Sequence, residues 1–172
     1  MMNTQEEQIE VLKKYNLFIR ILLVSTVLLS FGCHDPKNGE QHIIMGYYDN
    51  KSIISELASM LMVDNKLGRI DSIHTVPDNL IDAGITSTRL LKYRELMSSA
   101  NISVIMHIGG EVRFYTSLHS SKYHEVGYSL LDNKPSNLIQ SLDAYNCDDS
   151  LQIVYKLIEA KWYAFAICVP GK

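Results

Sequence analysis

Apolar residues between positions 53 and 62 recur at the spacing of a helix. One helical face would carry six of them: Ile53, Ile54, Leu57, Ala58, Leu61 and Met62. Asn50 or Ser52 is placed to cap this helix and Gly68 to end it, and the apolar stripe is expected to face the core. A second helix is predicted from about Ser87 to Ser99, where apolar residues again return with the helical period.

From residue 102 the pattern changes from helical to alternating. Gly109-Gly110 stands between two alternating runs, and glycine tolerates the positive φ of a two-residue turn, so a hairpin is predicted here. One face of that hairpin would carry Ile105, His107, Val112 and Phe114. Another strand is predicted over residues 123–131, and residues 69–76 are a candidate for a further short strand that Pro77 stops.

The last third of the chain predicts a short helix and a second hairpin. The stretch NKPSNLIQSLDAYN has Pro135 near its start and leucines at helical spacing. A hairpin turning at Glu159-Ala160 would place Tyr155 opposite Ala164, so that large side chains meet small ones. The fold class is therefore predicted to be α+β. We expect an antiparallel sheet of about five strands, made of two hairpins and one strand, with two or three helices packed on one face.

Ahead of these elements lies an apolar run of eleven residues, ILLVSTVLLSF, at positions 21–31. A helix needs roughly 20 apolar residues to cross a hydrocarbon core, so this run is too short, and extending it backwards brings in the charged Arg20. A basic flank, a short apolar segment and a small residue before a cut site are the parts of a secretory signal. We expect residues 1–32 to be a signal peptide, with an uncleaved anchor or a coincidental apolar helix as the alternatives.

The end of this run, Leu29-Ser30-Phe31-Gly32-Cys33, resembles the lipobox of bacterial lipoproteins. In that motif a small residue precedes a cysteine that is lipidated and becomes the first residue of the mature chain. The match departs in one place, since Ser30 stands where the lipobox usually has leucine. The resemblance implies a bacterial source, a palmitate-type lipid on Cys33, and attachment to a membrane of the cell envelope, facing the periplasm or the exterior.

The remaining chain is expected to form a tether and one domain. Residues 33–44 would be the lipidated cysteine and a polar tether, and residues 45–172 a single α+β domain. The formal net charge of −3 argues against a nucleic-acid partner, because binding to phosphates needs a clustered excess of Lys and Arg. Arg89, Lys92 and Arg94 share one short stretch, which is expected to be a solvated helix face and not an anion site.

The three cysteines allow a second expectation about the exported chain. If Cys33 carries lipid, Cys147 and Cys168 remain as an even pair. The hairpin register places Cys168 beside Leu151, close enough to Cys147 for a turn to bring the two within disulfide distance. The alternative is two buried thiols.

The catalytic motifs that sequence can reveal are absent. There is no Gly-rich phosphate loop, no G-x-S-x-G, no H-E-x-x-H and no paired C-x-x-C, so neither a cofactor nor a metal is expected. A small hydrolase remains imaginable around three histidines, His107, His119 and His124, with Ser120, Ser121 and Glu125 near the last two. Ser, Lys and His are ordinary loop residues, however, and His107 is expected to be a hydrogen-bonded core histidine.

The domain as a whole resembles small uncharacterised bacterial proteins, and that resemblance carries no activity. It rests on the glycine-turned hairpin, the pair Gly127-Tyr128, the stretch PSNLIQSLD and the closing KWYAF. The sequence therefore predicts a lipid-anchored envelope protein that is not an enzyme and binds a protein partner. An immunity-type inhibitor of an envelope-acting toxin and a small envelope hydrolase are the alternatives.

Overall fold

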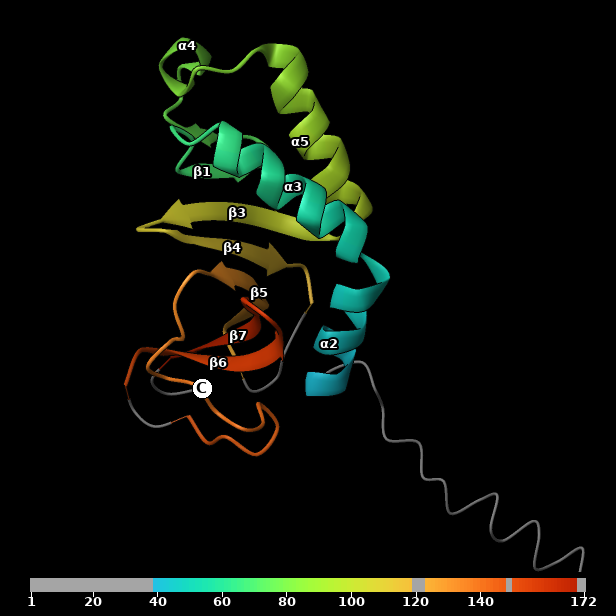
Figure 1. Cartoon of the computed structure of the whole chain (residues 1–172), viewed down its shortest axis with the longest axis vertical. Coiled ribbons are helices and arrows are strands. Elements are labelled where there is room, and N and C mark those ends of the chain that lie inside the picture. Colours follow the sequence, from blue (N-terminus) through green and yellow to red (C-terminus); the bar gives the residue numbers. More distant parts are fainter. Residues whose placement is uncertain (1–38, 119–122, 148–149, 170–172) are drawn as a thin grey trace, which may run out of the picture. The chain divides into compact units, whose positions relative to one another are not determined.

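Seven strands form one antiparallel sheet in the order β2-β1-β3-β4-β5-β7-β6 (Figure 1). The computed structural model describes residues 39–118, 123–147 and 150–169, all within the unit Pro36–Lys172. The described helices are α2 (Glu40–Asp49), α3 (Lys51–Val63), α4 (Leu80–Ala83) and α5 (Ser87–Ser99). The strands are β1 (Arg69–Asp71), β2 (Thr75–Val76), β3 (Ile102–Ile108), β4 (Glu111–Thr116), β5 (Glu125–Leu131), β6 (Gln152–Glu159) and β7 (Trp162–Cys168). The α+β class is confirmed, but the sheet is larger than the five strands expected.

The additional strands come from residues 69–76, which form a small hairpin of β1 and β2. The carboxylate of Asp71 accepts hydrogen bonds from the backbone N–H groups of Ile73 and His74, at 2.9 and 2.6 Å. This bends the chain back after three residues, as aspartate side chains often do in turns. The same two bonds hold the pKa of Asp71 below its usual value.

The first predicted hairpin is confirmed in its register. β3 and β4 pair so that Ile105 lies opposite Phe114 and His107 opposite Val112. Gly109 and Gly110 form the turn with φ values of 57° and 86°, in the region that side chains rarely adopt.

The second hairpin forms, but its predicted register is wrong by one residue. Its turn lies at Ala160-Lys161, where Lys161 has a φ of 66°, and the register shifts between Leu157 and Glu159. Tyr155 therefore faces Phe165 and not Ala164. A bulge of this kind adds one residue to one strand, which alternation alone does not reveal.

Two helices confirm the sequence patterns, and two others, α2 and the one-turn helix α4, were not expected. α3 and α5 cover the predicted stretches, and α5 has the predicted bounds. Residues 40–44, expected to belong to the tether, lie in α2 instead, and Ile43 is buried. Figure 1 shows α3 and α5 close to β1 and β3, and α2 beside the part of the sheet that contains β5. The rest of the expected tether lies outside the described residues.

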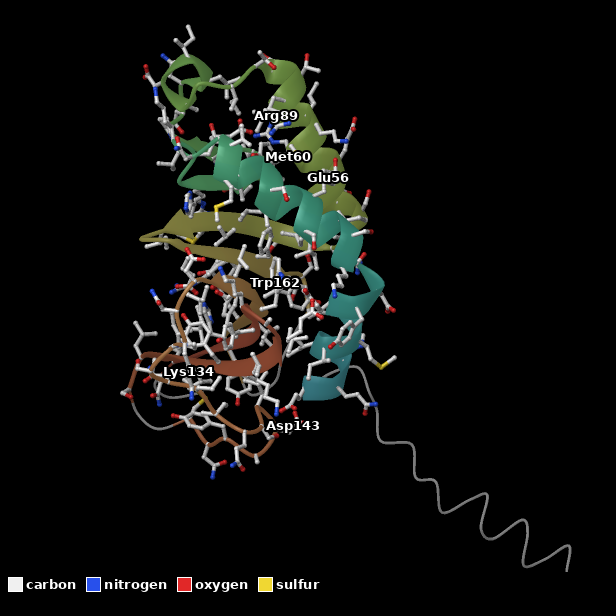
Figure 2. The ribbon with its side chains drawn as sticks, viewed as in Figure 1. Glu56, Met60, Arg89, Lys134, Asp143 and Trp162 are labelled. Carbon is white, nitrogen blue, oxygen red and sulfur yellow. A yellow bond between two sulfur atoms is a disulfide. The ribbon has the colours of Figure 1, made fainter. Side chains whose placement is uncertain are left out.

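A distant loop completes the first turn of α2. Gly39 at the N-cap has no side chain to offer, and the carboxylate of Asp143 accepts a 2.9 Å hydrogen bond from the N–H of Glu40 (Figure 2). The side chain of Glu40 accepts a 2.5 Å bond from the N–H of Leu142 in return. The first bond satisfies a helix N–H group that otherwise lacks a partner, and the second fastens the loop to the start of α2.

The helix expected after Pro135 is absent. The described residues of the connection between β5 and β6 form turns, and part of the connection pairs with the free edge of β6. Ile139 donates from its N–H to the carbonyl of Tyr155, whose own N–H donates to Asn137. Backbone groups that a helix would have paired internally are thus satisfied by the sheet.

The main core lies between the helices and one face of the sheet. Leu57 of α3 and Tyr93 of α5 are fully buried together with Ile105 and Phe114. Trp162 of β7 lies near the middle of the molecule in Figure 2, and its ring is 5.8 Å from that of Phe114. We call this side of the sheet the helix-covered face.

Candidate functional site

The opposite side of the sheet has no helix among the described residues. Successive side chains of a strand point to opposite faces of the sheet, so every second residue of the central strands points away from the helices. They form a second cluster around four buried rings, Tyr115, Tyr155, Tyr163 and Phe165. The residues of this helix-free face are Val104, Met106, Ile108, Glu111, Arg113, Tyr115, Ser129, Leu131, Ile153, Tyr155, Leu157, Tyr163, Phe165 and Ile167.

A charged network lies within this face. Arg113 donates from Nη2 to Glu111 Oε2 at 2.5 Å, and both residues belong to β4. Ser129 Oγ and Tyr155 OH donate to Glu111 Oε1 at 2.6 and 3.0 Å. Arg113 Nη2 also reaches the Tyr155 hydroxyl at 3.2 Å. Both charged side chains are largely buried, so each depends on the other and on these hydroxyls for stabilisation.

The protonation states of the network are fixed around neutral pH. Burial by itself would raise the pKa of Glu111, but the hydrogen bonds from Arg113 and Ser129 outweigh it, and the pKa lies below its usual value. Burial and the nearby carboxylate raise the pKa of Tyr155 to about 12. The pKa of Arg113 is raised, because its bond to Glu111 outweighs the opposing effect of burial. Each group of the network is therefore held in one charge state near neutral pH.

Of the candidate hydrolytic histidines, the two that the structure describes, His107 and His124, lie far apart. His107 lies near the glycine turn, at the level of Leu130 on β5, whereas His124 precedes β5 at its other end. Six residues of strand separate these levels, which is about 20 Å. His124 and Glu125 are exposed. His119, Ser120 and Ser121 lie outside the described residues.

Of the two alternatives for the remaining cysteines, a disulfide or two buried thiols, the structure shows the disulfide. Cys147 and Cys168 form a disulfide with Cα atoms 5.5 Å apart, although Cys168 lies opposite Gln152 and not Leu151. The bond fastens the end of β7 to the loop that carries Leu142 and Asp143 to α2. Cys33 lies outside the described residues. In the described part of the chain no three His, Cys, Asp or Glu side chains are grouped in a way that could hold a metal.

The network was missed in the sequence although its signal was present. Once Gly109-Gly110 is the turn, Glu111, Arg113 and Tyr115 must share a face of β4. A carboxylate and a guanidinium two residues apart on one strand face lie close enough to form an ion pair. Their partners Ser129 and Tyr155 come from other strands, and the Tyr155 position depended on the register that sequence assigned wrongly.

Fold and site together define a small α+β protein with one helix layer and a charged network in a sheet face of otherwise aliphatic and aromatic side chains. Searches against family models, curated proteins and solved structures found no match. Among the described helices, none has the length and apolar character needed to cross a membrane.

Proposed function

We propose that the protein is a lipid-anchored protein of the bacterial cell envelope that binds an apolar surface of a protein partner through the helix-free face, without catalysing a reaction. The observation that carries the proposal is the Glu111–Arg113 network in the middle of a tyrosine-rich face. Tyrosine and arginine are enriched where protein interfaces concentrate their binding energy. The two charges compensate each other and the four rings are buried, so the face offers a partner the apolar side chains at its border and no net charge.

The border of this face supports the same proposal. Ile108 and Leu157 are about half exposed, at 46% and 48%, on either side of the buried rings. Apolar side chains of this size lose water-exposed area when a partner covers them, which stabilises a complex by about 25 cal/mol for each Å². Since the ion pair is internal to the face, we expect partner binding to depend little on salt.

The anchor gives the proposal a geometric limit. If Cys33 carries the lipid, residues 34–39 connect it to the start of α2, and six extended residues span about 20 Å. The start of α2 is fixed to the loop at Leu142 and Asp143. The start of α2 would then lie within about 20 Å of the lipidated residue.

Metabolic labelling with an alkyne-bearing palmitate tests the anchor. The natural chain should be labelled, and Cys33→Ser should lose the label. Ser30→Leu, which restores the residue that a lipobox usually has, should keep or increase it. Equal labelling of the Cys33→Ser chain would refute lipidation at this position.

Site-specific photo-crosslinking in cells tests the binding face. We would replace Leu157 with p-benzoylphenylalanine, and as a matched control Leu91 of α5, which is similarly exposed at 59% but lies on a helix. A defined cross-linked product should appear with position 157 and not with position 91. The product should persist at high salt. Cross-linking at both positions alike, or at neither, would contradict a role for the helix-free face.

A further inference from the structure

A pocket of about 420 Å³ lies outside the helix-free face, between the end of α5, the β1–β2 turn and the start of β3. Its volume falls within the range of small-molecule sites, roughly 300 to 1,000 Å³. The lining is unusual in carrying four serines. The residues that line it are Ser72, Arg94, Met97, Ser98, Asn101, Ile102, Ser103 and Ser117.

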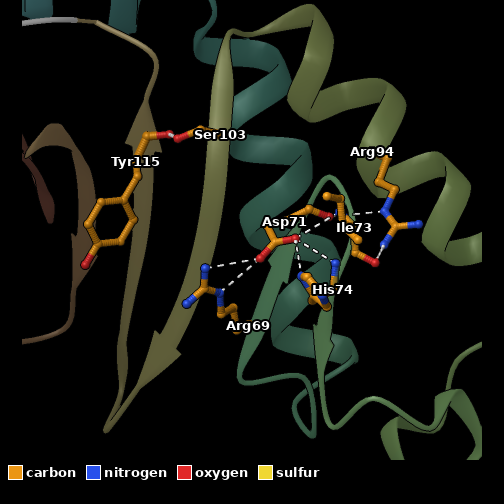
Figure 3. Close-up of polar contacts among 7 residues, drawn as sticks. All are labelled: Arg69, Asp71, Ile73, His74, Arg94, Ser103 and Tyr115. Atoms are coloured by element: carbon orange, nitrogen blue, oxygen red, sulfur yellow. Dashed lines mark hydrogen bonds and ion pairs between the residues drawn. The ribbon is translucent and has the colours of Figure 1, made fainter.

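Arg94 differs from the other described arginines. Arg69, Arg89 and Arg113 each have a carboxylate within 4 Å, whereas in the described part of the chain Arg94 forms no ion pair. Its Nε donates to the carbonyl of Asp71 at 3.1 Å and its Nη2 to that of Ile73 at 2.9 Å (Figure 3). These two bonds fix the guanidinium while leaving three of its five N–H hydrogens and its charge available.

The neighbouring cations show that this situation is particular to Arg94. Arg89 pairs with Asp64 at 2.8 Å in a partly buried contact, and Lys92 pairs with Glu56 at 2.8 Å on the exposed surface of the helix. The expectation of a solvated helix face is therefore met at Lys92, whereas the charge of Arg89 is compensated by a partly buried carboxylate. The third cation, Arg94, is held by the β1–β2 turn at the wall of a pocket.

The rest of the lining supplies hydrogen-bonding groups for an uncharged part of a ligand. Figure 3 shows Ser103 and Arg94 to either side of the β1–β2 turn. The hydroxyl of Ser103 donates to the carbonyl of Tyr115, and no protein partner is found in the described part of the chain for those of Ser72, Ser98 and Ser117. A hydroxyl both donates and accepts, so these three match ligand hydroxyl groups. The C-terminal end of α5 is also nearby, and its partial negative charge opposes an anion at that end, so the oxyanion is expected at the guanidinium of Arg94 and the hydroxyls beside the helix end.

We infer that this pocket binds a sugar-sized, hydroxyl-bearing molecule that carries one oxyanion, with Arg94 binding the oxyanion and the serines binding the hydroxyls. A carboxylate and a phosphate ester both fit a guanidinium, which can bind either with two parallel hydrogen bonds. The inference stands on the pocket alone and does not depend on the helix-free face or on the anchor.

Calorimetric titration of the full chain in detergent tests the inference with four probes. Glucuronate and glucose 6-phosphate represent the two oxyanions, glucose the neutral sugar, and inorganic phosphate the bare anion. At least one of the first two should bind saturably, and glucose and phosphate should bind about tenfold more weakly or worse, since each lacks one of the two recognised groups. Which of the first two binds more tightly identifies the oxyanion.

Variants connect the binding to the pocket. Arg94→Gln should weaken the affinity about tenfold or more through loss of charge-assisted hydrogen bonds, and Arg69→Gln, which removes an arginine already paired with Asp71, should not change it. Ser98→Leu narrows the pocket without touching Arg94. Its control is Ser99→Leu, because Ser99 does not line the pocket and bonds to Glu95.

The outcomes separate cleanly. No saturation by either oxyanion probe up to about 10 mM, corresponding to a free energy weaker than about −3 kcal/mol, overturns the inference. Binding of glucose as tight as that of the oxyanions, or unchanged binding in Arg94→Gln, also overturns it. If Arg94→Gln fails to fold because the β1–β2 turn loses its two bonds, the Ser98→Leu and Ser99→Leu pair decides, and equal affinities of these two overturn the inference.

Discussion

The two faces of the sheet are closed in different ways. The helix-covered face buries aliphatic and aromatic side chains under α2, α3 and α5, with Ile54, Leu57 and Phe114 fully inaccessible. The helix-free face has no helix layer in the described structure and is closed by its own tyrosines, by Phe165 and by the Glu111–Arg113 network. A sheet face without a covering layer can exclude water with large rings and a compensated ion pair, and it then keeps groups that a partner can recognise.

Gly127→Ala should disturb both faces at once and have the largest effect. A Cβ atom at this position of β5 would lie 2.0 Å from the carbonyl oxygen of Phe114 and 2.9 Å from the ring of Phe165. Because the first of these atoms is backbone, strands β4 and β5 would have to separate, at a cost of about 4 kcal/mol or more. Urea unfolding measures the loss. Gly68→Ala is the control, since its nearest atom would be 3.7 Å away, and a similar loss there would contradict the steric explanation.

Glu111→Leu should destabilise the protein by about 3 to 5 kcal/mol. It leaves the guanidinium of Arg113 largely buried without a carboxylate, and removing one partner of a buried pair costs more than removing both. The double variant Glu111→Leu, Arg113→Met should recover a good part of the loss. On the helix-covered face, Leu57→Ala should lower the unfolding free energy by a similar 2 to 5 kcal/mol, because it leaves a cavity. This loss involves no unpaired charge, so removing a charged side chain elsewhere should not recover it. Denaturant unfolding of all four chains tests this contrast, and an undiminished loss in the double variant would contradict it.

Loss of the disulfide should cost roughly 3 kcal/mol, because Cys147 and Cys168 close a loop with a sequence separation of 21. The disulfide stabilises the helix-covered side of the sheet, where Cys168 is fully buried and Cys147 packs against the core. Unfolding of Cys147→Ala, Cys168→Ala measures it. A reducing agent should lower the stability of the natural chain and leave that of the double variant unchanged. A loss in the double variant below about 1 kcal/mol would mean that the loop is held by the Glu40–Asp143 contacts alone.

The elements that sequence predicted correctly are those with a strong local signal. α5 and the β3–β4 register were determined by apolar period and by Gly109-Gly110, both of which act within a few residues. The helix at Glu40 was missed because its first turn is completed by Asp143, a residue 103 positions away. The helix after Pro135 was wrongly predicted for the converse reason. Its backbone found partners on β6 that the local pattern does not contain.

The candidate sites were harder to foresee because their members come from several strands. Ser129 and Tyr155 reach Glu111 from β5 and β6, and one bulge in the last hairpin was enough to misplace Tyr155. Arg94 looked the same in sequence as Arg89 and Lys92. Only the positions of Asp64 and Glu56 on or beside α3 separate the two paired cations from the third.

The smallest expected effect is a difference in acid sensitivity between the faces. The pKa of Glu111 in the folded protein lies below its usual value, so the stabilisation from its ionised form is fully present above the unfolded pKa of about 4.3 and is lost as the pH falls through the folded pKa. The difference in unfolding free energy between the natural chain and Glu111→Gln should therefore be constant from pH 7 to about 5 and shrink below about 4. The same difference for Leu57→Ala should not change with pH, because the substitution removes no titrating group. Denaturant titrations at each pH measure both, and a parallel decline in the two variants would assign the acid sensitivity to the molecule as a whole and not to the helix-free face.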